Sequence, residues 1–142
     1  MSEPLTSMPA AATEPTAAPA DWLPVRFIYD DDAFYWMNDS SSTIRVESFA
    51  FERVAGSDRF DANRFAFYSM EPGRCMQIMF VEVARSGCPE GRRPNAFFTP
   101  SRRQGVDFWT GDAGQFHVLR NGVEVAVCDI AAGQCSANVP RS

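Results

Sequence analysis

The sequence predicts an all-β fold, a sandwich of about seven or eight strands. Short runs in which apolar and polar side chains alternate recur along the chain, as they do in strands with one buried face. Aromatic residues form 13% of the 142 residues, and the 12 Phe among them favour pleated, half-buried surfaces. Turns rich in Gly and Pro separate the runs and no stretch keeps a helical period, which is typical of a β-sandwich.

The first residues differ in composition from the rest of the chain. Residues 1–21 consist mostly of Pro, Ala, Thr, Ser and Glu. Such a segment cannot bury enough apolar surface to offset its ordering entropy. We therefore expect a disordered or extended tail or linker over residues 1–21, followed by one β-sandwich domain over residues 22–142. The tail is also where we expect contact with a partner protein.

The sequence as it stands predicts neither a membrane span nor a signal peptide. Its apolar runs fall short of the ~18 residues that a transmembrane helix needs. The first residues lack the basic and apolar regions of a signal peptide. Three alternatives remain at this point: an export signal that lies outside this chain, export by another route, or a cytosolic protein.

The first strands are predicted on either side of an acidic turn. Residues 24–38, PVRFIYDDDAFYWMN, form two short β segments around the aspartates at 30–32. In residues 42–54, STIRVESFAFERV, the alternation of apolar residues shifts by one at Ser48. A strand cannot shift in this way without changing face, so we expect a bulge or a bend there.

The middle of the chain predicts a strand, a tight turn and a second strand. The alternation in residues 58–70 places Phe65 and Phe67 on one face. Pro72 and Gly73 fit the central positions of a type II turn. An apolar strand follows within residues 75–83.

The last third combines the least regular and the clearest patterns. Residues 86–105 hold three Pro and three Gly, and we expect them to form the longest irregular stretch. A short strand is predicted over residues 106–110, VDFWT. In residues 115–130, QFHVLRNGVEVAVCDI, Asn121 and Gly122 stand between two alternating runs and predict a β-hairpin with a type I′ turn.

The charged and titratable residues indicate no catalytic site, cofactor or metal. A formal net charge of −5 argues against binding to nucleic acid, which needs a basic face. Three adjacent aspartates at 30–32 lack the alternating pattern of a calcium loop, which favours a solvated turn over a Ca²⁺ site. His117 is the only histidine and no triad or zinc motif surrounds it, so we expect it on the solvent face of a strand. We therefore do not expect an enzyme.

The four cysteines are compatible with several kinds of site. Twelve residues separate Cys75 from Cys88, and six separate Cys128 from Cys135. These gaps lack the close pairs of zinc sites and of C-x-x-C redox motifs, and buried free thiols in a cytosolic protein are a further alternative. Two disulfides fit better, because each pair flanks a local loop at a strand end. Among the three possible connectivities we favour Cys75–Cys88 and Cys128–Cys135.

Persistent disulfides form in oxidising compartments. On this ground we expect an extracytoplasmic location, at the cell surface or secreted.

Three stretches resemble the lamin-tail domain, an immunoglobulin-like sandwich that also occurs on secreted bacterial proteins. They are a strand running into polar turn residues, a Pro-Gly turn feeding an apolar strand, and a Gly-Asp turn before a closing hairpin: FYWMNDSSSTIRVESFAF, MEPGRCMQIMF and FWTGDAGQFHVLRNGVEV. The resemblance covers residues 34 to about 128. This sequence departs from the family's pattern in its added cysteines and in its long loop at residues 86–105.

The run from Val125 to Cys135 is also similar to the end of uncharacterised C-terminal β modules on surface proteins of Chloroflexota. Neither resemblance implies an activity. Together they imply an immunoglobulin-like β-sandwich that serves as an interaction domain.

The expected function is a non-catalytic protein-interaction or structural module, an accessory subunit or surface adaptor of an extracytoplasmic assembly. Besides the tail, the predicted partner contacts lie in and beside the loop at residues 86–105: Phe97, Phe98, Arg102, Arg103 and Trp109. The alternative is a carbohydrate-binding module that uses exposed aromatic side chains such as Trp36 and Trp109.

Overall fold

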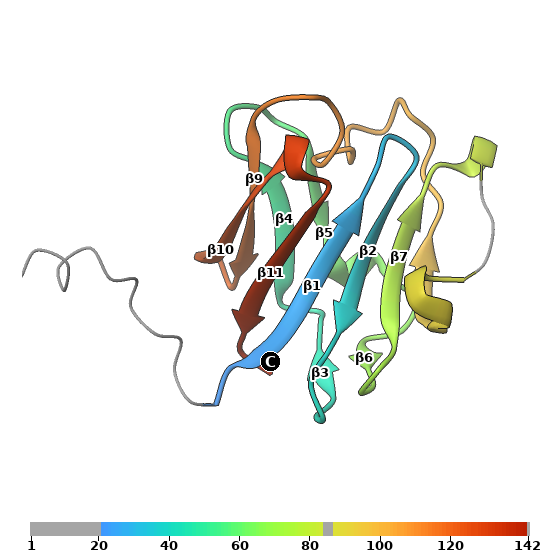
Figure 1. Cartoon of the computed structure of the whole chain (residues 1–142). Coiled ribbons are helices and arrows are strands. Elements are labelled where there is room, and N and C mark those ends of the chain that lie inside the picture. Colours follow the sequence, from blue (N-terminus) through green and yellow to red (C-terminus); the bar gives the residue numbers. More distant parts are fainter. Residues whose placement is uncertain (1–20, 84–86, 142) are drawn as a thin grey trace, which may run out of the picture.

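The computed structural model describes residues 21–83 and 87–141, and these residues form an all-β sandwich (Figure 1). The predicted tail lies outside the described residues except for Asp21. The strands are β1 (Leu23–Tyr29), β2 (Ala33–Asn38), β3 (Ile44–Arg45), β4 (Phe49–Arg53), β5 (Arg59–Asp61), β6 (Ser69–Met70), β7 (Cys75–Met79), β8 (Pro94–Phe98), β9 (Gln115–Arg120), β10 (Val123–Asp129) and β11 (Gln134–Val139). Single turns of 3₁₀-helix are η2 (Ala62–Arg64), η3 (Val81–Val83), η4 (Pro89–Gly91) and η5 (Ile130–Ala132).

The strands are arranged in two main layers, which confirms the predicted sandwich. A five-stranded sheet has the order β11-β1-β2-β7-β8, and a four-stranded sheet has the order β10-β9-β4-β5. Figure 1 shows β11, β1, β2 and β7 side by side, with β9, β4 and β5 behind them. The short strands β3 and β6 pair with each other at one end. In the described residues the two main sheets together hold more strands than expected, because β8 and β11 lie in segments where the sequence indicated no strand.

Local turn chemistry explains the connections that were predicted. Asn121 and Gly122 have φ values of 51° and 80°, and these two positive angles define the type I′ turn between β9 and β10. Gly73 has a φ of 75°, and the N–H of Arg74 donates to the carbonyl of Glu71, which closes the type II turn before β7. At Ser48, where the apolar alternation shifts, the chain makes a turn. This turn leads from β3 in the two-stranded sheet to β4 in the four-stranded sheet.

The main core consists of aromatic side chains from the two facing sheets. Phe34 of β2 contacts Phe51 of β4 with a centroid distance of 5.1 Å and Phe116 of β9 at 5.8 Å. Trp36 contacts Phe49 at 5.1 Å. Edge-to-face packing of this kind stabilises the core in addition to the stabilisation from buried apolar area.

A second apolar cluster lies on the outer face of the five-stranded sheet. It is formed by Ala33, Tyr35, Met37, Cys75 and Met79, which are all buried. Both faces of β2 are therefore covered, and its six residues are buried without alternation. Partly buried Val83 and Cys88, from the connection between β7 and β8, pack against this cluster.

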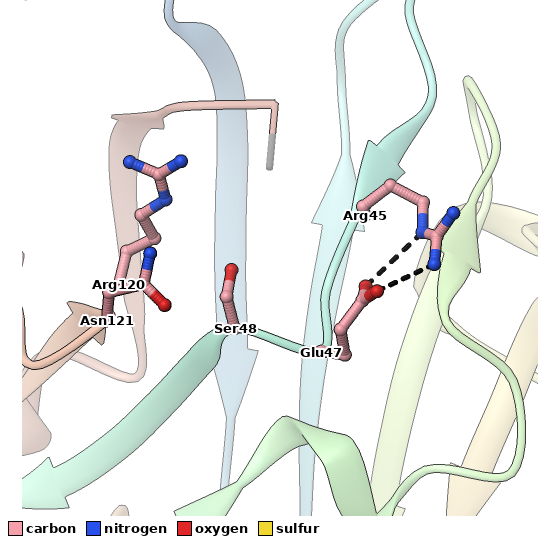
Figure 2. Close-up of a pocket in the computed structure, with 5 residues that line it drawn as sticks. All are labelled: Arg45, Glu47, Ser48, Arg120 and Asn121. Carbon is pink, nitrogen blue, oxygen red and sulfur yellow. Dashed lines mark hydrogen bonds and ion pairs between the residues drawn. The ribbon is translucent and has the colours of Figure 1, made fainter.

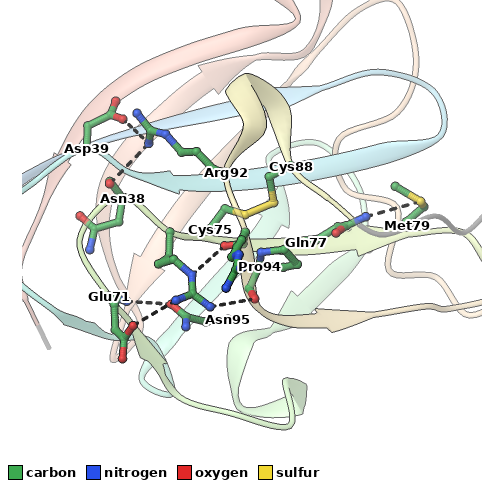
Figure 3. Close-up of a disulfide and its surroundings, with 12 residues drawn as sticks. Asn38, Asp39, Glu71, Cys75, Gln77, Met79, Cys88, Arg92, Pro94 and Asn95 are labelled. Carbon is green, nitrogen blue, oxygen red and sulfur yellow. Dashed lines mark hydrogen bonds and ion pairs between the residues drawn. A yellow bond between two sulfur atoms is a disulfide. The ribbon is translucent and has the colours of Figure 1, made fainter.

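Both predicted disulfides are present. Cys75 is bonded to Cys88 with a Cα–Cα distance of 6.7 Å, and Cys128 to Cys135 with 5.7 Å. The first bond fastens the β7–β8 connection to the outer face of its own sheet (Figure 3). The second joins β10 to β11, the edge strands of the two different sheets.

Across residues 21–83 and 87–141, none of the helical segments has the length and apolar character needed to span a membrane.

Candidate functional site

The outermost strand of the five-stranded sheet, β8, is a sheet edge that carries an exposed aromatic side chain. It pairs with β7 in parallel, and within the described residues no strand covers its other edge. Ala96 is aligned with Met76, and both belong to the main core. Phe97 is aligned with Gln77 on the opposite face, and it is 57% exposed. An edge strand with unpaired N–H and C=O groups can accept a further strand.

Exposed arginines surround this edge. The guanidinium of Arg64 lies 4.5 Å from the centre of the Phe98 ring, a cation–π contact. Arg93 immediately precedes β8, Arg103 follows it, and both are exposed. None of these three arginines forms an ion pair in the part of the chain that the structure describes. The edge is therefore locally basic, although the net charge of the chain is −5.

Four of the residues predicted to contact a partner lie at or near this edge, but they do not form one patch. Phe98 is adjacent to Phe97 and so points to the other face, where its ring packs 5.2 Å from that of Phe60. Arg102 lies over the ring of Phe80 at 4.2 Å and pairs with Asp32 at 3.1 Å. Arg103 is exposed. Phe97 is thus the apolar anchor of the predicted set, while Phe98 and Arg102 also make intramolecular contacts.

Trp109 is buried, which corrects its prediction as a contact residue. It is 1% exposed, its ring stacks on Phe80 at 5.4 Å, and its indole N–H donates to the carbonyl of Asp30 at 2.8 Å. The predicted strand at residues 106–110 is also absent, because these residues form turns whose side chains Val106, Phe108 and Trp109 fill the end of the core.

The aromatic row required for carbohydrate binding is not formed by the tryptophans named for it. Trp36 is 1% exposed, as Trp109 is, and its ring packs against Phe49 and Phe51 in the main core. These two side chains cannot stack on a sugar at the surface.

The only histidine lies on the outer face of the four-stranded sheet between two carboxylates. His117 Nε2 is 3.1 Å from Glu52 and Nδ1 is 3.0 Å from Glu124. Partial burial lowers the pKa of His117, but the hydrogen bonds with Glu124 and Glu52 outweigh it and raise the pKa above its ordinary value. The hydrogen bond with His117 in turn lowers the pKa of Glu52. The arrangement is a cross-strand ion-pair row, which Arg59 extends by pairing with Glu52 at 3.5 Å.

The acidic turn at residues 30–32 has structural partners. Asp30 Oδ1 accepts hydrogen bonds from the backbone N–H groups of Asp32 and Ala33, both at 2.9 Å. Asp32 pairs with Arg102. Among the residues that the structure describes, no three His, Cys, Asp or Glu side chains gather in a way that could hold a metal ion.

A cluster of ion pairs holds the β7–β8 connection against β1. Arg26 donates to both carboxylate oxygens of Asp39, at 2.6 and 3.1 Å, and to both of Glu90, at 2.6 and 2.8 Å. Arg92 donates to Asp39 at 2.6 Å (Figure 3). The hydrogen bonds from Arg26 lower the pKa of Asp39. Glu90 has a φ of 63°, which is uncommon for a residue other than glycine, and this backbone angle accompanies its bidentate contact with Arg26.

A shallow pocket opens between the turn after β3 and the β9–β10 hairpin (Figure 2). Its volume is about 370 Å³, and it is lined by Arg45, Glu47, Ser48, Arg120 and Asn121. Arg45 and Glu47 pair with each other at 2.6 Å. Figure 2 shows this pair on one side of the pocket and Arg120 with Asn121 on the other, with the Ser48 hydroxyl between them.

The sequence did not predict the ion-pair cluster around Arg26 or the pocket beside the β9–β10 hairpin. Ser48 and Asn121 were identified from the phase shift and the Asn-Gly pair, as features of the backbone. The pocket depends on the register between β4 and β9, which aligns Phe49 with Arg120 and so brings the turn after β3 beside the hairpin. No local pattern indicates that Arg26 and Glu90, which are 64 residues apart, meet on one sheet face.

Comparisons with protein-family models and with curated proteins found no match to the chain.

Proposed function

We propose that this domain is a non-catalytic protein-interaction module, an accessory subunit or surface adaptor of an extracytoplasmic assembly. It binds its partner through the free edge of β8, where an extended segment of the partner adds a strand to the five-stranded sheet. The observation that carries this proposal is Phe97, which is 57% exposed on a strand with one unpaired edge. In strand addition, backbone hydrogen bonds supply affinity and alternate side chains supply specificity.

The positive charge around β8 favours a partner segment that is acidic. Arg64, Arg93 and Arg103 have no acidic partner among the described residues, and all three are exposed. Carboxylates on the incoming strand would pair with them and speed the encounter, as complementary charges do at other interfaces. Arginine and Phe are also among the residues enriched in interface cores.

The two disulfides support the proposed location. In reducing compartments glutathione and thioredoxin keep thiols reduced, whereas secreted and surface proteins retain disulfides. A module held together by Cys75–Cys88 and Cys128–Cys135 is suited to work outside the cytoplasm.

The test places a photo-crosslinking residue at position 97 in the protein expressed in its native host. Position 67 is the matched control, because Phe67 is 50% exposed but lies outside β8. We expect crosslinking from position 97 to capture one partner through an acidic segment, and crosslinking from position 67 not to capture it. The F97D variant should reduce recovery of that partner by about tenfold or more, the loss typical of an interface hot spot.

Equal recovery of the same proteins from positions 97 and 67 would contradict the proposal. So would a crosslinked segment without acidic residues. The thermal unfolding of F97D serves as the folding control, and it should match that of the unaltered protein because Phe97 is outside both apolar clusters.

A further inference from the structure

We propose that the pocket between the turn after β3 and the β9–β10 hairpin binds a carboxylate group. This site is separate from the β8 edge, because its lining comes from residues 45–48 and from residues 120 and 121. Its ligand is an organic acid or the acidic end or side chain of a peptide, and both sources present the same chemistry.

Backbone hydrogen bonds fix the two sides of the pocket. The N–H of Asn121 donates to the carbonyl of Ser48 at 2.9 Å, which joins the hairpin turn to the turn between β3 and β4. The N–H of Arg45 donates to the carbonyl of Arg141 at 2.7 Å, which joins β3 to the C-terminal segment. Asn121 is held at a φ of 51° by the type I′ turn. The backbone on the two sides of the pocket is therefore set by the fold before any ligand arrives, which lowers the entropy loss on binding.

Arg120 supplies an unused cationic donor. Its Nε atom is buried and has no hydrogen-bond partner, and its guanidinium forms no ion pair with the described residues. Because Nε has almost no solvent-accessible surface, a ligand in the pocket would pair with the terminal NH₂ groups of the guanidinium, which are not among the buried unpartnered atoms of the described residues. Carboxylates suit this role because a guanidinium presents several N–H groups in one plane. The Ser48 hydroxyl and the Asn121 amide are further donors in the lining.

The charges of the lining favour a monoanion. Arg45 is already neutralised by Glu47, through bonds of 3.3 and 2.6 Å, so Arg120 provides the one remaining formal charge of the five lining residues. A carboxylate balances that charge. A phosphate dianion would place its second charge near Glu47, where like-charge repulsion opposes binding. The volume of about 370 Å³ leaves space for the rest of a molecule that carries the carboxylate.

The experiment is an NMR titration of the oxidised protein with sodium acetate at constant ionic strength, with chloride as the exchanged anion. We expect saturable shifts of the Arg120 Nε–H signal and of the amides of residues 47, 48 and 121, with dissociation constants on the order of millimolar. N-acetylglycylglycine and its C-terminal amide form a second arm. The acid should bind and the amide should not. If N-acetylglycylglycine binds more tightly than acetate, the site is assigned to the carboxyl ends of peptides.

R120Q should remove the saturable shifts, and S48A should weaken acetate binding by roughly threefold, since one hydrogen bond is lost. R59Q is the matched control, because Arg59 is exposed and lies outside both the pocket and the β8 edge, and it should leave the titration unchanged. Absence of saturable shifts, unchanged titration of folded R120Q, or tighter binding of inorganic phosphate than of acetate would overturn the proposal. The integrity of R120Q is checked by its backbone spectrum, and S48A keeps the test valid if R120Q does not fold.

Discussion

At the scale of single residues, polar side chains in this domain are defined by the partners that the fold brings to them. Asn38 is completely buried, and its side chain makes four hydrogen bonds. The amide donates to the carbonyls of Ser42 and Met70, both at 2.9 Å, and the oxygen accepts from the N–H and the hydroxyl of Ser40. A buried amide with this many partners stabilises one arrangement of the chain and penalises others. It ties the end of β2 to the turn that follows it and to β6.

His117 shows the same principle with a titratable group. Its pKa is raised in the folded state by Glu124 and Glu52, so protonation of the ring is favoured by folding. The resulting stabilisation is fully present below the ordinary value of 6.5 and is lost as the pH rises through the raised value. Glu52 has a lowered pKa, so its contribution is present above 4.5 and is lost as the pH falls through the lowered value.

The corresponding prediction concerns H117Q. Between about pH 5 and pH 8 the difference in unfolding free energy between the unaltered protein and H117Q should shrink as the pH rises. At the acidic end we expect it to be roughly 0.5–1 kcal/mol, the size of a partly exposed ion pair. Urea denaturation at several pH values measures it, with R103Q as a control that should give no such trend. A difference that grows with pH would contradict the assignment of the raised pKa.

At this scale the sequence was informative about backbone positions and weak about partners. Asn121, Gly122 and Gly73 adopt the positive φ values that their turns require, because turn chemistry is local. His117 was expected on the solvent face of a strand, but its two glutamates come from neighbouring strands and depend on register. Trp109 was misassigned to the surface, because a Trp beside a loop carries no local sign of which way it points.

At the scale of elements, the connection between β7 and β8 acts as a cover for one face of a sheet. It is fastened at three points, by the Cys75–Cys88 bond and by the pairs Arg26–Glu90 and Arg92–Asp39. The N–H of Cys88 also donates to the carbonyl of Arg92 at 3.1 Å. The apolar cluster below it, on β2 and β7, would otherwise be an exposed hydrophobic patch.

Removal of the first disulfide should therefore loosen this cover before it affects the rest of the domain. In C75A/C88A we expect a loss of about 3 kcal/mol of unfolding free energy, from the entropy of the loop that the bond closes. Hydrogen exchange should accelerate at positions 88 and 92, whose N–H groups donate to the carbonyls of Arg92 and Pro89, with little change in β9 and β10. Uniform acceleration across all strands would show that the bond serves the whole domain and not this segment.

Elements were predictable where one sequence pattern dominated. Their prediction failed where Pro, Gly or the short length of the element obscured the pattern. The hairpin of β9 and β10 and the apolar strand β7 lie where they were expected. The stretch at residues 86–105 was expected to be irregular, yet it contains β8, because its prolines stand at the strand's first residue and outside it. Phe65 and Phe67 do not share a face. The 3₁₀ turn η2 precedes them and period-2 alternation does not hold, so Phe65 is buried and Phe67 exposed.

At the scale of the whole molecule, two sheets face each other across an aromatic core and are joined covalently along one side. Backbone hydrogen bonds hold strands within each sheet, but β10 and β11 belong to different sheets. The Cys128–Cys135 bond closes the sandwich there. Along the other side, the contact of Phe60 in β5 with Phe98 in β8 brings the opposite edges together without a covalent link. Within the described residues β8 pairs with no strand beyond β7, whereas β11 is tied to β10.

This asymmetry leads to a prediction about oxidation state. In the protein isolated under non-reducing conditions from its native host, a thiol-alkylating reagent should modify none of the four cysteines, and peptide mapping should give Cys75–Cys88 and Cys128–Cys135. C128A/C135A should lose about 2.5 kcal/mol of unfolding free energy by the same loop-closure argument. Because this bond spans the two sheets, hydrogen exchange should accelerate in both of them, in contrast to the local effect in C75A/C88A. Full alkylation of all four cysteines without reductant would mean that the bonds do not form in the cell, and the inference of an oxidising compartment would lose its basis.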